Sequence, residues 1–297
     1  MPLTVMLESF FSNHTRRECE DTVVYFLLSD LSEQNREFFE QYVAAHGSKI
    51  RYLNVGKEEF AGLPVKSYIS RETYFRLLAS ELLPAEEHRV LWIDADTVIN
   101  GNLKAFYNSN FEGSAVIACP HGELMKPVMI QNCAEIGITV PEQYFNAGVM
   151  LCNLDVWRTM KIRERIRRIL DEKRSFKFPG QDLTNRIFNG KVKTADWEKY
   201  NCMTHSVLPD SIARLEQEAV IIHYVGRAKP WIFHDLPFND ICHHLTQGFF
   251  RCAVRANHTC SSQAYRCCKV IFLYHGLIVV LYIYLLYFFN RFNIRIS

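Results

Sequence analysis

The chain has 297 residues, 48% of them hydrophobic and 22% charged, which is the balance of a folded protein and excludes global disorder. Its formal charge of +2 at pH 7 combines two unlike regions, because no Asp or Glu follows Asp240 whereas six of the 34 Lys and Arg do. The residues up to Asp240 therefore carry 28 basic against 32 acidic side chains, and this acidic body argues against a binder of duplex nucleic acid, which needs a basic face.

Strand-like and helical patterns alternate along the first two-thirds of the chain. Helices are predicted at 3–13, around 36–42, at 72–83, near 156–172 and at 182–188; strands are predicted at 22–28, 49–55, 89–93, 115–119, 148–152 and 220–224. This alternation predicts an α/β fold with a mixed, mostly parallel sheet covered on both faces. Ligands of such folds bind at the carboxyl ends of the strands.

The end of the chain differs from the rest. Residues 270–289 form an apolar stretch interrupted only by His275 and Gly276. At ~1.5 Å per residue this stretch matches a hydrocarbon core of ~30 Å, so it predicts a transmembrane or membrane-associated helix. A basic linker containing cysteines (236–269) would precede it, and a basic tail (290–297) would follow. The alternatives are a buried helix or a non-native reading-frame extension.

The ten cysteines show no Cys-x-x-Cys pair, which argues against a zinc site. Several lie in apolar runs, where a cysteine behaves as a small buried hydrophobe, and this indicates a reducing compartment. The first residues lack the basic start and the continuous apolar core of a signal peptide.

Two carboxylates, Asp94 and Asp96, directly follow the predicted strand at 89–93. Residues two apart on an extended segment face the same way, so both carboxylates can point into one site while Ala95 points back to the core. Such a pair is a plausible seat for Mg²⁺ or Mn²⁺ on a diphosphate. Taken alone, the pattern is better explained by a solvated turn, because Asp-x-Asp occurs by chance about once in a chain of this size.

Three further segments carry polar residues beside small ones. The first is His223, Gly226 and Lys229, which offer an imidazole, a close backbone approach and a point charge for phosphate. The second is Asn146 and Gly148, which suit a sugar hydroxyl, and the third is Gln181 and Asp182 at a helix start. Singly, each has a structural explanation: a hydrogen-bonded core histidine, a turn or a capping acid.

Together and in order, these segments resemble glycosyltransferase family 8, which includes the bacterial lipopolysaccharide galactosyl- and glucosyltransferases and glycogenin. The resemblance runs over residues 2–233. Its motifs are ISRETYFRL (69–77), LWIDAD (91–96), YFNAGV (144–149), GQDLTN (180–185) and HYVGRAKPW (223–231).

The resemblance implies a GT-A (Rossmann-like) nucleotide-sugar-binding fold, a catalytic domain over 1–235, and a retaining hexosyltransferase. It implies a UDP-glucose or UDP-galactose donor and a saccharide, lipid-linked or lipopolysaccharide acceptor. The apolar and basic tail would hold the protein at the cytoplasmic face of a membrane, a bacterial inner membrane. The resemblance also implies Mn²⁺ (or Mg²⁺) on Asp94, Asp96 and His223; donor binding by Arg76, Asp94, Ala95, Gly148, Gly226 and Lys229; and Asn146, Gln181 and Asp182 at the donor sugar.

The sequence departs from the family at two places. Family members open with a strand and an Asp- and Asn-rich loop that hold the uracil and ribose, whereas residues 2–9 here already match the following helix. Many members also have Asp-Gln-Asp where this chain has Gly180-Gln181-Asp182. A second hypothesis is therefore a truncated, weakly active or inactive membrane-attached binding protein with an unpaired sheet edge. A third, a metal-dependent phosphohydrolase using Asp94 and Asp96, needs more ligands than the sequence offers.

Overall fold

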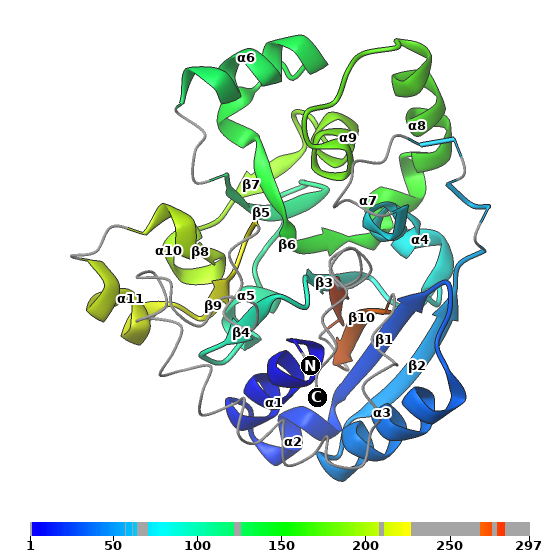
Figure 1. The fold of residues 1–297 in the computed structure, drawn as a ribbon, viewed down its shortest axis with the longest axis vertical. Coiled ribbons are helices and arrows are strands. Elements are labelled where there is room, and N and C mark those ends of the chain that lie inside the picture. Colours follow the sequence, from blue (N-terminus) through cyan, green and yellow to red (C-terminus); the bar gives the residue numbers. More distant parts are fainter. Residues whose placement is uncertain are drawn as a thin grey trace, which may run out of the picture.

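The structure, a computed structural model, describes residues 2–56, 58–60, 62–63, 71–121, 126–207, 211–226, 268–274 and 278–282. Its centre is an eight-stranded sheet with the order β2-β1-β10-β11-β3-β6-β5-β7 (Figure 1). The strands are β1 (Thr22–Leu28), β2 (Lys49–Asn54), β3 (Arg89–Ile93), β5 (Val116–Pro120), β6 (Phe145–Asn153), β7 (Val192–Thr194), β10 (Cys268–Tyr274) and β11 (Ile278–Tyr282).

This sheet is mixed, as predicted, and six of its eight strands run in the same direction, although four of its seven neighbour pairings are antiparallel. Neighbours β1–β2, β11–β3 and β5–β7 pair parallel, and the other neighbours pair antiparallel, so only β6 and β10 run against the rest. The middle strand β3 is apolar, and Val90, Leu91, Trp92 and Ile93 are all fully buried. A strand buried on both faces needs such a continuous apolar run, which explains why this segment was the clearest strand in the sequence.

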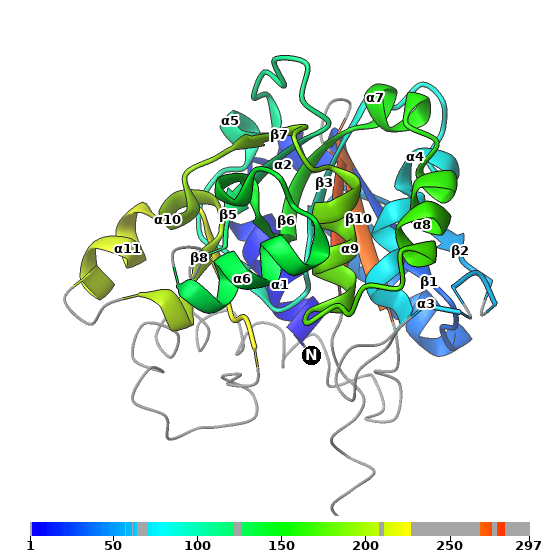
Figure 2. The same cartoon turned by 90° about the horizontal axis from the view of Figure 1, so that it is seen from above.

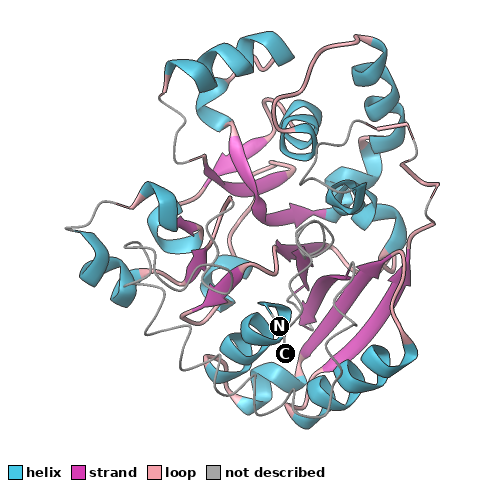
Figure 3. Ribbon diagram, viewed as in Figure 1, coloured by secondary structure: helices cyan, strands magenta, loops and turns pink. Residues whose placement is uncertain are grey.

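Helices surround the strands (Figure 3). They are α1 (Pro2–Ser12), α2 (Arg16–Glu20), α3 (Glu33–Ala45), α4 (Ala79–Leu82), α5 (Lys104–Tyr107), α6 (Pro127–Ile136), α7 (Leu154–Thr159), α8 (Ile162–Asp171), α9 (Pro179–Ile187), α10 (Trp197–Tyr200) and α11 (Ile212–Glu218), with 3₁₀ turns η1 (Arg71–Leu78), η2 (Pro141–Gln143) and η3 (Thr204–Ser206). Helices α4, α7 and α8 gather on one side of β3 and β10, and α1 and α2 lie on the other (Figure 2).

Two predicted helices are interrupted. The helix expected at 156–172 is divided into α7 and α8 by Lys161, which has a left-handed backbone with φ of 50°. The helix expected at 72–83 begins as the 3₁₀ segment η1 and continues as α4. There the Arg76 side chain donates to the Thr73 carbonyl at 2.9 Å, and so takes an acceptor that an α-helical N–H would use.

A small second sheet, with the order β4-β9-β8, lies with α10 and α11 at one side of the molecule (Figure 1). Its strands are β4 (Thr97–Ile99), β8 (Cys202–Met203) and β9 (Ile221–His223). Helix α1 is bound to this sheet, because the Ile99 N–H donates to the Ser9 hydroxyl at 2.9 Å and Asn13 donates to the Ile99 carbonyl at 2.9 Å. The antiparallel pairing of β4 with β9 places Thr97 opposite His223, and this register brings two parts of the candidate site together.

The apolar C-terminal stretch contains strands where a helix was expected. In the described part of 270–289, β10 pairs with β1 and β11 pairs with β3, so the stretch fills the sheet between them. The helix prediction is wrong for these residues, because the facing edges of β1 and β3 offer backbone donors and acceptors that an extended apolar segment can satisfy. The unpaired edge that the second hypothesis expected beside β1 is likewise not found in the described residues.

No helix among the described residues is both long enough and apolar enough to cross a bilayer. Residues 275–277 and 283–297, and the linker up to residue 267, lie outside the described residues, so membrane association of the tail stays a prediction.

Candidate active site

Asp94, Asp96 and His223 meet where β3 ends. Each offers a ligand atom, and these atoms all lie within 4.8 Å of one another in a buried setting. The Asp94 N–H donates to the Gly148 carbonyl at 2.7 Å, which extends the β3–β6 ladder by one bond. The Tyr224 N–H donates to the Asp96 carbonyl at 2.9 Å, which fixes the end of β9 against the start of β4. The hydrogen bonds of the β3–β6 and β4–β9 strand pairs therefore position the three candidate metal ligands.

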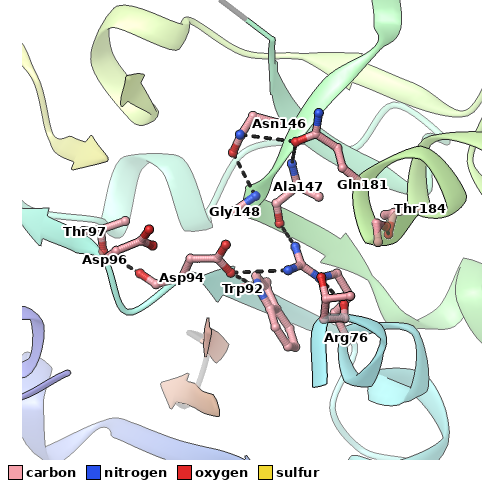
Figure 4. A network of polar contacts seen from close by, with 12 residues as sticks. Arg76, Trp92, Asp94, Asp96, Thr97, Asn146, Ala147, Gly148, Gln181 and Thr184 are labelled. Carbon is pink, nitrogen blue, oxygen red and sulfur yellow. Dashed lines mark hydrogen bonds and ion pairs between the residues drawn. The ribbon is translucent and has the colours of Figure 1, made fainter. Parts of the chain in front are cut away.

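Asp94 is held by two donors. Trp92 Nε1 donates to Asp94 Oδ1 at 2.9 Å, and the Arg76 guanidinium lies 3.4 Å from the same oxygen (Figure 4). Burial raises the pKa of Asp94 above its ordinary value; the Arg76 charge lowers it and the Asp96 charge raises it again. A cation between the two carboxylates would relieve that repulsion and compensate the lost hydration.

The donor set suits a hard divalent ion. Two carboxylates and an imidazole are ligands for Mn²⁺ or Mg²⁺, and among the described residues this is the one such group of three. A second group of three such side chains, of the kind a two-metal phosphohydrolase would use, is not found in that part of the chain. Ala95, between the two acids, is buried in the main core as expected.

Gly148 gives this cluster its room. A Cβ there would lie 2.2 Å from His223 Cε1, 2.9 Å from Asn146 Oδ1 and 3.0 Å from Asp94 Oδ2. Since real Cβ atoms essentially never come closer than 3.0 Å to a neighbour, only glycine fits between the ligands. Gly148, which was predicted at the donor, thus leaves space for the side chains of the candidate metal ligands.

Amide groups lie beside the cluster at the start of β6. The Asn146 amide group donates to Gln181 Oε1 at 3.3 Å, and Gln181 Oε1 also accepts from the Ala147 N–H at 3.4 Å (Figure 4). Gln181 Nε2 donates to the Tyr144 hydroxyl at 3.1 Å. The Arg76 guanidinium donates to the Ala147 carbonyl as well as lying beside Asp94 Oδ1, so it connects β6 to the candidate metal ligands. Of these residues, Arg76, Asn146 and Gln181 were expected at the donor, and the fold brings them together.

Asp182 supports this arrangement from within the core. It is fully buried, and its carboxylate accepts from the Tyr144 hydroxyl at 2.6 Å, from Asn132 at 3.0 Å and from the Phe178 N–H at 2.7 Å. Burial raises the pKa of Asp182, and these hydrogen bonds oppose the shift. The expectation that Asp182 contacts the donor sugar stays a prediction; in the structure its oxygens face Tyr144, Asn132 and the helix start.

Two expected residues, Gly226 and Lys229, follow His223 in the sequence. Gly226 has a φ of 87°, in the left-handed region that favours glycine, three residues after His223. Lys229 lies outside the described residues. Gly180 replaces the acid of many family members, and a Cβ there would lie 2.3 Å from Thr73 Oγ1 and 2.5 Å from Thr73 Cγ2. The Thr73 side chain therefore fills the space that a larger residue at 180 would need.

Two residues of the site were missed by the sequence reasoning. Asn201 is fully buried; its Oδ1 lies 2.8 Å from His223 Nδ1, and its amide group donates to Asn146 Oδ1 at 3.2 Å. Tyr144 bridges Gln181 and Asp182. Tyr144 stands inside the YFNAGV motif and could have been noticed there. Asn201 follows α10 with no motif around it, so no local signal pointed to it.

Comparison with known proteins gives a consistent result. The family model described as Glycosyl transferase family 8 matches residues 2–234. The chain is similar to a lipopolysaccharide 1,2-glucosyltransferase of Escherichia coli K12, with 28% identity over 193 residues, 62% of this chain and 56% of that protein. It is also similar to a lipopolysaccharide 1,3-galactosyltransferase of Salmonella typhimurium LT2, with 25% identity over 225 residues, 71% of this chain and 65% of that protein. The match thus spans less than two thirds of either relative.

Solved structures show the same likeness. The galactosyltransferase LgtC in complex with donor and acceptor sugar analogues has a TM-score of 0.68 and 25% identity, covering 86% of this chain and 91% of that chain. The bifunctional glycosyltransferase WbbM has a TM-score of 0.62 and 16% identity, covering 84% of this chain and 49% of that one, and it shows the shared GT-A fold.

Proposed function

The chain belongs to glycosyltransferase family 8, and on that premise we propose that it transfers glucose or galactose from a UDP-sugar to a saccharide or lipopolysaccharide-type acceptor. The single observation that carries the proposal is the buried group of Asp94, Asp96 and His223, whose ligand atoms lie within 4.8 Å of one another. The two relatives are a glucosyltransferase and a galactosyltransferase of lipopolysaccharide, which supports the sugar and the acceptor class.

The chemistry needs charge stabilisation at the leaving group. Breaking the bond between the sugar and UDP develops negative charge on the β-phosphate, and a bound Mn²⁺ or Mg²⁺ would stabilise that charge where it appears. Arg76 and Trp92 both donate hydrogen bonds to Asp94 Oδ1, so Asp94 Oδ2 is the oxygen available to a cation. The strands hold these groups before the donor arrives, which removes a reorganisation cost from the reaction.

Retention of configuration then follows from front-face attack. Double displacement needs a carboxylate nucleophile, but Gln181 presents an amide beside the cluster, and the neighbouring Asp182 carboxylate is engaged by three donors. We therefore assign Gln181 to orienting the donor sugar, with the departing phosphate oxygen assisting deprotonation of the acceptor hydroxyl.

Release of UDP tests this proposal. The full chain, incubated with Mn²⁺ and a panel of UDP-sugars, should release UDP from UDP-glucose or UDP-galactose, and addition of a chelator or the substitution Asp96→Ala should abolish the release. Asp171→Ala, which removes an exposed acid at the end of α8, is the matched control and should leave the rate unchanged. Absence of release from every common UDP-sugar would contradict the proposal.

Attachment to the cytoplasmic face of a bacterial inner membrane remains a separate prediction. It rests on the basic and apolar composition of the C-terminal region. Sedimentation of the full chain with vesicles containing anionic lipid would test it, and recovery of all protein in the supernatant at low salt would refute it.

A further inference from the structure

A chain of hydrogen bonds of fixed direction runs from a backbone amide to a candidate metal ligand. It starts at Gly148, whose N–H donates to one side-chain atom of Asn146 at 2.9 Å. A backbone N–H can only donate, so that atom must be the oxygen Oδ1. The orientation of the Asn146 amide is thereby determined by the backbone of β6.

The same logic passes to the next amide. Asn201 contacts the same Asn146 oxygen at 3.2 Å, and an oxygen there requires a donor, so this atom of Asn201 must be Nδ2. The other atom of the Asn201 amide is then Oδ1, and it lies 2.8 Å from His223 Nδ1. An oxygen acceptor requires that His223 Nδ1 carry a hydrogen.

This assignment leaves the other ring nitrogen for a cation. His223 Nε2 lies 3.2 Å from Asp96 Oδ1, inside the group of candidate metal ligands. A histidine binds a metal through a nitrogen lone pair, and its other N–H is held by a partner that fixes the ring. Asn201 is that partner here, and it is fully buried, so water does not compete for the contact.

We propose that Asn201 is a positioning residue of this site: it fixes His223 in the form that binds a cation through Nε2, and it connects that ligand to Asn146. The inference rests on the proposed function, since it assumes that the site holds a divalent ion. Because Asn146 also donates to Gln181, the same hydrogen-bond chain joins the metal ligands to the amides assigned to the donor sugar.

Direct binding of Mn²⁺ to the purified full chain tests the proposal without turnover. The free Mn²⁺ signal in electron paramagnetic resonance gives the dissociation constant for the wild type and for Asn201→Leu, Asn201→Asp and Asp96→Ala. Asn201→Leu removes both hydrogen bonds and should weaken Mn²⁺ binding by about 10–100-fold, the usual effect of losing a partner of a metal-binding histidine. Asn35→Leu, which removes a buried asparagine on α3, is the matched control and should not change the constant.

Asn201→Asp separates positioning from general damage. A carboxylate still accepts from His223 Nδ1, so Mn²⁺ affinity should stay within a few-fold of the wild type. It no longer donates to Asn146, so the KM for the UDP-sugar should rise more than kcat falls.

The outcomes distinguish the two proposals. Wild-type affinity in Asn201→Leu, or a loss in Asn201→Asp as large as in Asn201→Leu, would overturn the role of Asn201 and leave the proposed function standing. If the wild type binds no Mn²⁺ and gives the same free Mn²⁺ signal as Asp96→Ala, the proposed function itself is overturned. If Asn201→Leu does not fold, as judged by circular dichroism, the Asn201→Asp comparison decides.

Discussion

A single methyl group at Gly148 should disable the metal site. The Cβ of Gly148→Ala would lie 2.2 Å from His223 Cε1. Carbon atoms in contact are separated by about 3.5 Å, so the imidazole must move by about 1.3 Å if the backbone holds. The backbone is held, because the Gly148 carbonyl accepts from the Asp94 N–H at 2.7 Å and the Gly148 N–H donates to Asn146.

This displacement exceeds what a metal ligand tolerates. Ligand distances must stay within about 0.2 Å of their ideal values, and a misplacement of about 1 Å in a catalytic site can reduce the rate by about 100-fold. We therefore expect Gly148→Ala to lose measurable Mn²⁺ binding and at least about 100-fold in kcat/KM for UDP release. Overpacking should also lower the free energy of unfolding by about 1–3 kcal/mol.

The assay compares two glycines. Mn²⁺ affinity, UDP release and urea unfolding are measured for Gly148→Ala and for Gly56→Ala, where a Cβ meets nothing within 4 Å. The control should match the wild type in all three. Mn²⁺ affinity and kcat/KM of Gly148→Ala within two-fold of the wild type would refute the reasoning that the methyl group displaces His223.

Three further results are expected. Ending the chain after Cys267 removes β10 and β11 and exposes the facing edges of β1 and β3, so it should abolish cooperative urea unfolding or cause aggregation. Ending the chain after Tyr282 keeps both strands and should do neither. An unchanged unfolding midpoint in the shorter chain would show that β10 and β11 do not complete the sheet. Gly180→Ala should lower the free energy of unfolding by about 1–3 kcal/mol, because the new methyl group meets the Thr73 side chain. In a double-mutant cycle, adding Thr73→Ala should restore much of that free energy. Additive effects of the two substitutions on the free energy of unfolding would contradict the contact. Burial raises the pKa of Asp182, so the folded state binds the Asp182 proton more tightly than the unfolded state does. This group therefore lowers the stability of the protein as the pH rises from the ordinary pKa of an aspartate through the raised pKa of the folded state. The stability advantage of the wild type over Asp182→Asn, measured by urea unfolding, should therefore be larger near pH 4 than near pH 7, and an advantage that grows with pH would contradict the shift.

The sequence by itself determined the strand that carries the acids and the motifs around it. The residues that follow Arg89, up to Ile93, are continuously apolar, which predicted a buried strand with Asp94 and Asp96 at its carboxyl end. The order of five motifs then indicated the family, and the alternation of strands and helices indicated a mixed sheet covered by helices.

The apolar tail shows what a local pattern leaves open. A run of Val, Ile, Leu and Phe fits a bilayer helix or a buried strand equally well, because both satisfy the backbone and bury the side chains. Only the sheet decides between them in the described part of the tail, since the facing edges of β1 and β3 both need a hydrogen-bonding partner.

The roles of single residues were decided by the tertiary structure for the same reason. Asn201 lies 22 residues from His223 and 55 residues from Asn146 in the sequence, so no spacing rule relates these three residues. Asp182 stands next to Gln181 in sequence, yet the helix turns its carboxylate toward Tyr144 in the core. Sequence position identified which residues gather at the end of β3, and three-dimensional packing decided which of them form the candidate metal site and which support it.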